Sequence, residues 1–222
     1  MKTAVIIPAA GTSVRMGTMK QLLILKDRPV LAHTLAAFEN HRKIDEIIMA
    51  APENVAEVIR PCGFKKLKAV VKGGGNRQAS VLAGLMAVSP DVGHVLIHDG
   101  ARPLVSRQVI SDVLEQVRCG RCAVSGVKSK DTIKIADENN VICDTPNRGN
   151  TWIVQTPQGF PLHIIKEAHL RALSDGFVGT DDAILVERIG FDVYMVEGDY
   201  RNIKLTTPED VPVAMVHMDG EF

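Results

Sequence analysis

Short apolar runs alternate with longer amphipathic stretches over the first half of the chain, and this alternation restricts the fold. The apolar runs have the length and composition of buried strands and lie at residues 4–9, 46–51, 69–72, 94–98 and 123–127. The stretches between them carry apolar residues three and four positions apart, as helices do, at residues 30–40, 55–62, 77–88 and 109–118. The alternation predicts an α/β fold in which helices cover both faces of a mostly parallel, twisted sheet.

The pattern changes in the segment after residue 127. Two runs that alternate apolar with polar residues, 132–136 and 141–143, flank a turn-like polar stretch at 137–140, and together they predict a hairpin. A two-stranded ribbon is only marginally stable alone. We therefore expect this protruding β-hairpin arm, at about 130–147, to pack on the parent sheet or on a second subunit.

The C-terminal third returns to α/β character. Helices are predicted at 162–174 and at 181–189, the latter capped by Thr180, followed by a strand at 192–196 and a last helix from Pro208. The chain has 222 residues, of which 45% are apolar, and it contains no repeat or linker. One substantial core of this size predicts a single domain, 1–222.

The charge balance limits the classes of partner. Lys+Arg and Asp+Glu number 26 each, so no global field attracts a polyanion, and nucleic acid and anionic membranes are not expected partners. The apolar run at the N-terminus is far too short for a signal peptide, and no later run is long enough to span a membrane. These features predict a cytoplasmic protein.

Cys119 and Cys122 form a C-x-x-C motif. A redox pair normally opens a helix, where the dipole lowers the pKa of the thiol. Here the pair follows a predicted helix and leads into a strand. Zinc would need two further ligands, and neither Cys62 nor Cys143 belongs to a second close-spaced pair. We expect neither a redox nor a metal role.

The first predicted strand runs into a loop of small residues, Pro8-Ala9-Ala10-Gly11, which is followed by Arg15 and Lys20. Small residues let backbone N–H groups approach an anion, and the two cations add fixed positive charge. An ordinary tight turn with two solvated cations has the same composition. The loop lacks both G-K-[ST] and the G-x-G-x-x-G spacing, so the sequence does not predict a P-loop ATPase or a dinucleotide-binding dehydrogenase.

Two further loops follow predicted strands. Gly73-Gly74-Gly75 precedes a predicted helix that carries Ser80 in its first turn, and glycine backbone can lie close to a flat base. Asp99 follows the fourth strand, where a carboxylate beside phosphate-binding loops is suited to Mg²⁺. Asp99 can equally pair with Arg102, and His98 is better interpreted as a packed or capping histidine than as a ligand.

These motifs carry a resemblance to a known family. The N-terminal loop with Arg15 and Lys20 resembles the signature of the 2-C-methyl-D-erythritol 4-phosphate cytidylyltransferases, which act in the non-mevalonate isoprenoid pathway. The likeness covers nearly the whole chain in order, through Gly73-Gly74, Arg77, Ser80-Val81, His98-Asp99, Ala101-Arg102-Pro103, Asp131-Thr132-Ile133-Lys134, Arg148, Trp152, Gln155-Thr156-Pro157-Gln158, Thr180-Asp181-Asp182 and Asn202-Ile203-Lys204-Leu205-Thr206.

The resemblance implies a Rossmann-like nucleotidyltransferase fold and a role for some of the matched residues. The implied catalytic residues are the cations Arg15, Lys20, Arg148 and Lys204. The implied CTP-binding residues are Pro8, Ala9, Ala10, Gly11, Gly74, Gly75, Ser80 and Asp99, with Asp99 serving the ribose or a divalent cation, Mg²⁺.

The second substrate, a polyol phosphate, is implied to meet a different set of residues. Arg148 and Lys204 would position its phosphate, and Arg102, Thr132 and Thr156 would complete its pocket. The resemblance also implies a homodimer through the arm. Ser13 stands where the family usually has a second glycine, and the segment from Arg15 to Lys20 is shorter than is common, so the triphosphate loop departs from the family pattern.

The reaction implied is direct displacement on the α-phosphate of CTP. A phosphate monoester is mostly dianionic at neutral pH because its second pKa is about 6, so the nucleophile needs no general base. The requirement is to bring two anions together, which calls for positioning and cations such as Mg²⁺, Arg15 and Lys20. The alternatives are a cytidylyltransferase for ribitol 5-phosphate or another polyol phosphate, and a nucleotide-binding regulator without catalysis.

Overall fold

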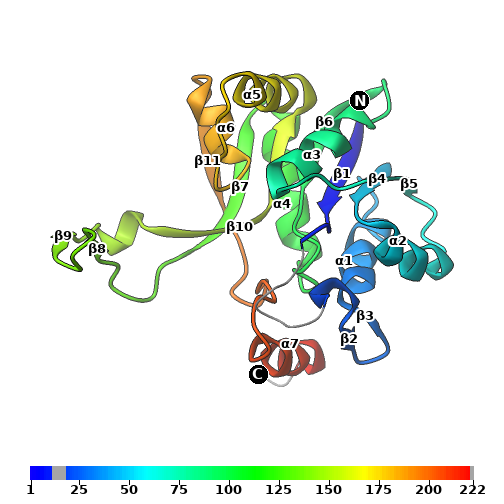
Figure 1. The fold of residues 1–222 in the computed structure, drawn as a ribbon, viewed down its shortest axis with the longest axis horizontal. Helices are drawn as coiled ribbons and strands as arrows, with labels where there is room; N and C mark the ends of the chain where they lie inside the picture. The colour runs from blue at the N-terminus through cyan, green and yellow to red at the C-terminus, as the bar shows by residue number, and fades with distance from the viewer. Residues whose placement is uncertain (12–18, 221–222) are drawn as a thin grey trace.

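The central element is a sheet of seven strands in the order β11-β7-β10-β6-β1-β4-β5 (Figure 1). The computed structural model describes residues 1–11 and 19–220, with the backbone alone at Lys20. The strands of this sheet are β1 (Lys2–Pro8), β4 (Glu46–Ala50), β5 (Leu67–Val71), β6 (Val92–Ile97), β7 (Cys122–Lys128), β10 (Trp152–Pro161) and β11 (Val193–Glu197). Every neighbouring pair is parallel except the two that involve β10. The predicted α/β fold with a mostly parallel sheet is confirmed.

Helices cover both faces of the sheet. The helices are α1 (Val30–Glu39), α2 (Glu53–Ile59), α3 (Arg77–Met86), α4 (Arg107–Arg118), α5 (Leu162–Ser174), α6 (Ala183–Arg188) and α7 (Asp210–Asp219). Side chains of α1, α2 and α4 pack with Val5 and Ile7 of β1, whereas those of α3, α5 and α6 pack with Ala4 and Ile6 on the opposite face. Because successive side chains of a strand point to opposite faces, a fully apolar strand serves both cores.

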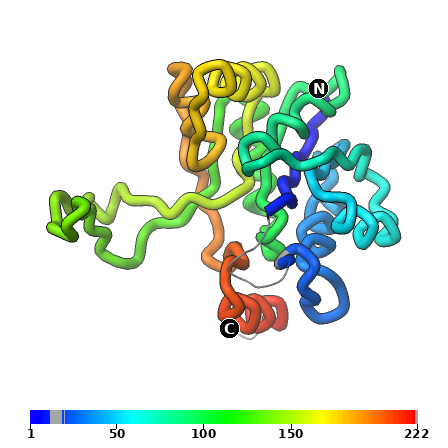
Figure 2. The backbone as a smooth tube through the Cα atoms, in the orientation of Figure 1, coloured from blue at the N-terminus to red at the C-terminus, as the bar shows by residue number. Residues whose placement is uncertain are grey.

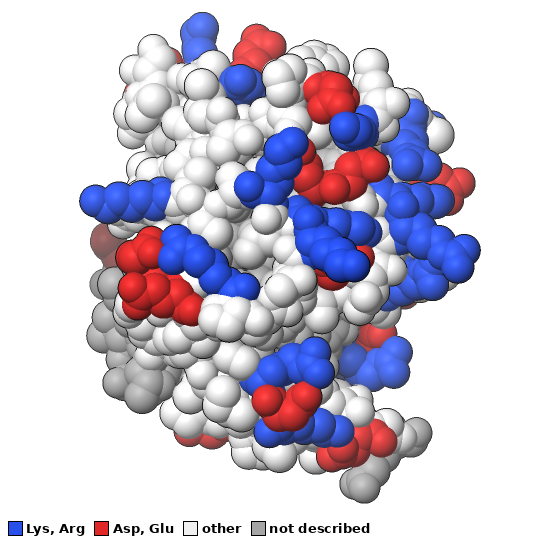
Figure 3. Space-filling view, turned by 90° about the vertical axis from the view of Figure 1, so that its right-hand side faces the viewer, with Lys and Arg blue, Asp and Glu red and all other residues white. Residues whose placement is uncertain are grey.

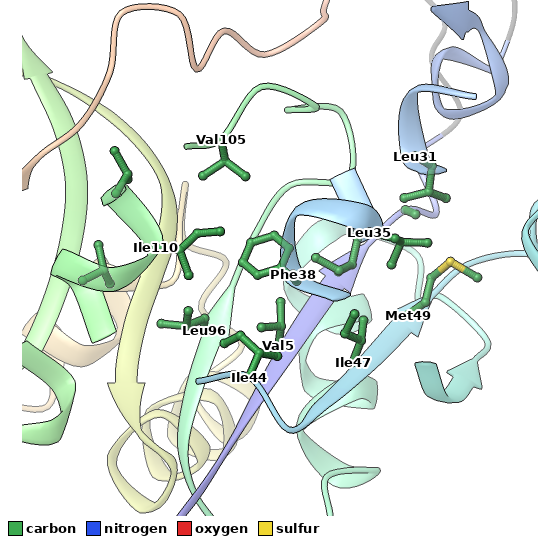
Figure 4. Close-up of a cluster of buried hydrophobic side chains, with 14 of the residues drawn as sticks. Val5, Leu31, Leu35, Phe38, Ile44, Ile47, Met49, Leu96, Val105 and Ile110 are labelled. Atoms are coloured by element: carbon green, nitrogen blue, oxygen red, sulfur yellow. The ribbon is translucent and has the colours of Figure 1, made fainter. Parts of the chain in front are cut away.

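Phe38 fills the centre of the first of these cores. Figure 4 shows it between Leu35 and Ile110, above Val5 and Leu96. The ring is fully buried, and its apolar neighbours come from α1, α4 and two strands. Phe38 therefore packs against β1 and β6, the strands that lead into two of the predicted ligand loops.

A third, smaller cluster joins distant parts of the chain. Leu25 lies in β2 (Ile24–Leu25), which forms a short ribbon with β3 (Arg28–Pro29). Leu25 and Val30 pack with Leu205 and with Ala214 of α7. Figure 2 shows the C-terminal helix close to this N-terminal ribbon. The cluster therefore fixes the segment before α7, which carries Lys204.

The strand β10 was not predicted as a strand. It lies between β6 and β7 and is antiparallel to both. Its prolines and Gly159 oppose a central-strand interpretation, since proline cannot donate to the ladder. The structure accommodates Pro157 where the β10–β7 register is interrupted, between Val154 and Gln158. The helix prediction at 181–189 also changes: α6 is shorter, and Asp181 rather than Thr180 accepts a hydrogen bond from its first turn, from Ile184 N.

The segment between β7 and β10 extends away from the body of the chain (Figures 1 and 2). It contains an antiparallel pair, β8 (Ile135–Ala136) and β9 (Ile142–Asp144). Its apolar side chains are exposed, including Ile135 at 50% and Val141 at 60% of their accessible surface. Within one chain the arm therefore has an uncovered apolar surface.

The molecular surface carries both signs of charge. On the face shown in Figure 3, Lys and Arg side chains lie among Asp and Glu, with the largest group of cations along one edge. No helix in the described part of the chain has the length and apolar character required to cross a membrane. Cys122 is buried, and burial raises the pKa of its thiol to about 11. A thiol with a raised pKa is a poor nucleophile.

Candidate active site

Three loops meet at the carboxyl ends of β1, β5 and β6 and enclose a cavity of about 260 Å³. Its lining residues are Pro8, Ala10, Gly11, Gln21, Gly74, Gly75, Asn76, Arg77, Ser80, Asp99, Gly100, Ala101 and Lys204. The side-chain amide of Gln21 donates to the carbonyl oxygens of Ala9 and Gly11, at 3.2 and 3.0 Å, and so holds the first loop in place. We call this cavity the glycine-loop pocket.

Ser80 organises the second loop from inside α3. Its hydroxyl oxygen accepts a hydrogen bond from Gly74 N at 3.0 Å and donates to the Asn76 carbonyl at 2.9 Å. The side chain of Asn76 caps the helix by accepting from Ala79 N. The triglycine segment is thus bound to the helix start, and its backbone forms one wall of the pocket.

Gly74→Ala should disrupt this wall, because a Cβ at that position would lie 2.4 Å from the Ala79 Cβ and 2.9 Å from the Ala79 carbonyl carbon. We expect a loss of about 1–3 kcal/mol in the free energy of unfolding and weaker nucleotide binding, measured by urea denaturation and calorimetry. Gly75→Ala is the control, since a Cβ there meets nothing within 4 Å. Equal stability of the two variants would contradict this prediction.

A second cavity of about 320 Å³ adjoins the first. It is lined by Arg77, Asp99, Arg102, Val154, Gln155, Thr156, Gln158, Thr180, Asp181 and Lys204. We call it the β10 pocket. Arg77, Asp99 and Lys204 line both cavities, so these three residues form a shared wall between the pockets.

Asp99 is the centre of the shared wall. Its Oδ1 accepts a hydrogen bond from Arg77 Nε at 2.9 Å, and its Oδ2 lies 2.9 Å from Lys204 Nζ and 3.7 Å from Arg102 Nε. Burial opposes ionisation of Asp99, but Arg77, Lys204 and Arg102 outweigh it and hold the pKa of the carboxyl well below its usual range. Asp99 is therefore a carboxylate surrounded by three cations.

Arg77 connects this wall to the interior. Its Nη1 donates to Asp182 Oδ2 at 2.7 Å, and Asp182 Oδ1 lies 3.0 Å from His169 Nε2 on α5. Burial lowers the pKa of Arg77, but the carboxylates of Asp182 and Asp99 more than offset that effect, so the net shift is upward. The guanidinium is therefore fixed between two carboxylates from different elements.

Behind Asp99, His98 and Thr156 form a buried chain of hydrogen bonds. His98 Nε2 lies 3.1 Å from the Arg102 carbonyl oxygen, so it donates, and Nδ1 accepts from the Thr156 hydroxyl at 3.0 Å. The same hydroxyl oxygen accepts from Asp99 N at 3.1 Å. The His98 ring packs on Phe38 with centroids 4.9 Å apart. The interpretation of His98 as a packed histidine agrees with this geometry.

The buried His98 makes stability depend on pH. Burial lowers its pKa to about 4 despite the nearby Asp99 carboxylate, against about 6.5 in an unfolded chain. Between these values the unfolded chain binds a proton that the native protein does not, so stability is lost as the pH falls. We expect about 2 kcal/mol less stability from this group at pH 5 than at pH 7, measured by urea denaturation.

His41 and His94 also contribute to this loss of stability, because burial lowers their pKa values too. The variant His98→Gln separates the contribution of His98 from theirs. The variant should lose about 2 kcal/mol less than the wild type between the two pH values. An identical loss in both proteins would show that His98 is not the group responsible.

The structure brings together most of the predicted site residues in the described part of the chain. Those that line a pocket are Pro8, Ala10, Gly11, Gly74, Gly75, Ser80, Asp99, Arg102, Thr156 and Lys204. Ala9, which belongs to the first loop, is buried and lines neither pocket. Arg15 and Ser13 lie outside the described residues, and the side chain of Lys20 is not described.

Thr132 and Arg148 lie elsewhere. Both are exposed and belong to the arm, and neither lines either pocket. Arg148 Nη1 donates a hydrogen bond to the Lys130 carbonyl oxygen, at 3.5 Å. One chain by itself therefore does not bring these two residues to the pockets.

Sequence reasoning gave no role to Arg77, Gln158 or Asp182. Gln158 Oε1 accepts from the backbone nitrogens of Asp182 and Ala183, both at 3.1 Å, and so fixes the wall of the β10 pocket. The available signals were an arginine two positions after a glycine loop and two adjacent aspartates before a predicted helix. Neither signal reveals that the residues meet.

The predicted role of Asp99 as a metal ligand requires free carboxylate oxygens. In the structure both of its oxygens face cationic side chains, and no group of three or more His, Cys, Asp and Glu residues in the described ranges is arranged to hold a metal ion. This arrangement does not fit a cation held by Asp99, so we assign no chemical step to one.

An α/β sheet with two joined pockets at the carboxyl ends of its strands is typical of enzymes that bind nucleotides or other small ligands. The sequence profile of the family described as "IspD: 2-C-methyl-D-erythritol 4-phosphate cytidylyltransferase" matches residues 3–219. The chain belongs to this family.

Two relatives illustrate the similarity in sequence. The 2-C-methyl-D-erythritol 4-phosphate cytidylyltransferase of Caldanaerobacter subterraneus subsp. tengcongensis is 45% identical over 221 residues, which cover 96% of this chain and 97% of that protein. The protein of the same name from Syntrophotalea carbinolica is 46% identical over 232 residues, which cover 100% and 99%.

Solved structures agree with this assignment. The crystal structure of 4-diphosphocytidyl-2C-methyl-D-erythritol synthase from Anaerococcus prevotii superposes with a TM-score of 0.88 at 33% identity, covering 98% of this chain and 96% of that one. The 2-C-methyl-D-erythritol 4-phosphate cytidylyltransferase of Thermus thermophilus gives 0.80 at 36% identity, with 99% and 100% covered.

Proposed function

We propose that this chain transfers CMP from CTP to 2-C-methyl-D-erythritol 4-phosphate, giving 4-diphosphocytidyl-2-C-methyl-D-erythritol and pyrophosphate for isoprenoid precursor synthesis. Family membership supports the substrates. The main structural support for the proposal is that Arg77, Asp99 and Lys204 line both pockets. A substrate bound in each pocket would therefore contact these shared residues and lie next to the other substrate. The proposed substrate CTP is a free nucleotide of the cytoplasm, so we propose that the protein acts in the cytoplasm.

The glycine-loop pocket suits the nucleotide. Part of its wall consists of small residues such as Gly11, Gly74 and Gly75, which permit close approach of a flat base and ribose. The β10 pocket contributes Arg102 and Lys204, cations that suit a phosphate dianion. An oxygen of that phosphate forms the new bond to the α-phosphorus of CTP, the bond from α-phosphorus to the bridging oxygen breaks, and pyrophosphate leaves.

Cationic groups near the reacting phosphates lower the barrier by offsetting the repulsion between the two anions. Lys204 stands at the junction of the pockets, while Arg15 and Lys20 keep the roles implied by the family resemblance. Mg²⁺ is usually bound through substrate phosphates with few protein ligands. We therefore propose that magnesium enters with the triphosphate and not on Asp99.

We further propose that the chain works as a homodimer in which the arm reaches the partner's site. The uncovered apolar side chains of the arm, such as Ile135 and Val141, call for a partner surface. Arg148 and Thr132 line neither of the two pockets of their own chain. A twofold dimer would satisfy both requirements at once.

Pyrophosphate release from CTP with each of two acceptors tests the function. We expect 2-C-methyl-D-erythritol 4-phosphate to be used far faster than ribitol 5-phosphate. Faster turnover of ribitol 5-phosphate would transfer the assignment to that acceptor. Tight CTP binding without pyrophosphate release from either acceptor would indicate a nucleotide-binding regulator.

A further inference from the structure

Asp182 and His169 form a buried polar pair that no step of the reaction uses directly. Asp182 is 1% exposed and His169 is fully buried. Neither lines the glycine-loop pocket or the β10 pocket. Burying a carboxylate is costly unless it is paired, so the pair needs a reason.

The carboxylate of Asp182 is not required to shape its own segment. The backbone nitrogens of Asp182 and Ala183 are already bound by Gln158 Oε1. Asp182 precedes α6, yet its side chain makes no capping hydrogen bond to that helix. Its two oxygens are instead directed to Arg77 Nη1 and His169 Nε2.

Arg77 needs such a partner because of where it stands. It is the first residue of α3, where the helix dipole disfavours a cation. Two of its nitrogens are bonded to different carboxylates, Nε to Asp99 and Nη1 to Asp182. The plane of the guanidinium is therefore set by the interior pair as much as by the pocket.

We propose that Asp182, oriented by His169, is a positioning residue that holds Arg77 and thereby sets the Asp99–Lys204 ion pair in the shared wall. The contacts run without a gap from α5 to Lys204: 3.0 Å from His169 to Asp182, 2.7 Å to Arg77, 2.9 Å to Asp99 and 2.9 Å to Lys204. Without Asp182, Arg77 has Asp99 as its remaining carboxylate and competes with Lys204 for it. The Lys204 amine then loses part of its ion pair with Asp99, so it is more accessible and its position in the shared wall is less fixed.

The test compares Asp182→Asn, His169→Leu and His169→Gln. Gln can keep an N–H near the position of Nε2, so it should restore what Leu removes. His41→Leu is the matched control, because His41 is also buried but its Nε2 contacts Ser111 on α4. Two quantities are measured: the rate at which a small acylating reagent labels Lys204, relative to the exposed Lys65, and kcat/KM for pyrophosphate release.

For Asp182→Asn and His169→Leu we expect labelling of Lys204 to rise severalfold and kcat/KM to fall about 10- to 100-fold. His169→Gln and His41→Leu should stay within about twofold of the wild type. In a Lys204→Met background, Asp182→Asn should have little further effect on kcat/KM, because coupled residues are non-additive. If Asp182 had only a structural role, Asp182→Asn would lower kcat/KM in the Lys204→Met background by the same factor as in the wild type.

Labelling and kcat/KM that do not change in His169→Leu and Asp182→Asn, or that change equally in His41→Leu, would overturn the proposal. The measurement of kcat/KM rests on the proposed function, whereas the rate of labelling of Lys204 can be measured whatever reaction the protein catalyses. A wild-type protein that releases no pyrophosphate would refute the proposed function while labelling still decides the positioning role. Should Asp182→Asn fail to fold, the Leu and Gln variants at position 169 suffice.

Discussion

Lys204→Met is expected to lower kcat for pyrophosphate release by about 10²–10³ while the protein folds normally. Lys204 lines both pockets and contacts Asp99 at 2.9 Å, and its side chain is 39% exposed. A partly exposed lysine contributes little to the core, whereas a preorganised cation at the junction of two anionic substrates stabilises charge that develops in the transition state. The measurement is kcat at saturating concentrations of both substrates, together with the midpoint of urea unfolding.

Lys65→Met is the matched control, because Lys65 is exposed and lines none of the pockets described above. It should keep the activity of the wild type. If Lys204→Met retained near-normal kcat at saturation, the placement of the reaction at the shared wall would be wrong.

Mixing two inactive variants should restore activity if the arm serves the partner's site. Lys204→Met damages the body of the chain and Arg148→Ala damages the arm, so a mixed dimer would have one site with both defects and one with neither. With random pairing about half of the dimers are mixed, and roughly a quarter of all sites should regain full activity. Two differently tagged variants are refolded together, and pyrophosphate release is measured on the mixture.

The control mixes Lys204→Met with Lys20→Ala, two changes in the body of the chain. Each site of that mixed dimer keeps one defect, so activity should not return. If double-tag purification recovers mixed dimers of Lys204→Met and Arg148→Ala whose activity equals that of the separate variants, the arm does not complete the neighbouring site.

Local sequence patterns predicted an element well where its apolar residues follow the spacing of a strand buried on both faces or of an amphipathic helix. The run from Ala4 to Ile7 is fully apolar and fully buried, and α4 carries its apolar residues at helical spacing. The glycine loops were located for a related reason, since the carboxyl ends of parallel strands meet at one edge of the sheet.

The strand β10 shows where a local pattern fails. Pro157, Gly159 and Pro161 lower any strand propensity, and Ile153 and Val154 near the start of the strand are exposed. Its strand character comes from pairing with β6 and β7 on either side. Tertiary context thus overrode propensity.

The amino-acid sequence by itself determined the periodicity of each element and the small or charged residues of each loop, because these depend on near neighbours. The Arg77–Asp182 contact joins residues 105 positions apart, and only the packing of α3 against the segment before α6 creates it. The same holds for Asp99, which the sequence offered as a metal ligand and the fold surrounded with three cations. Arg102 lies three positions from Asp99, so the sequence could offer it as a partner, but Arg77 and Lys204 reach the carboxylate only through folding.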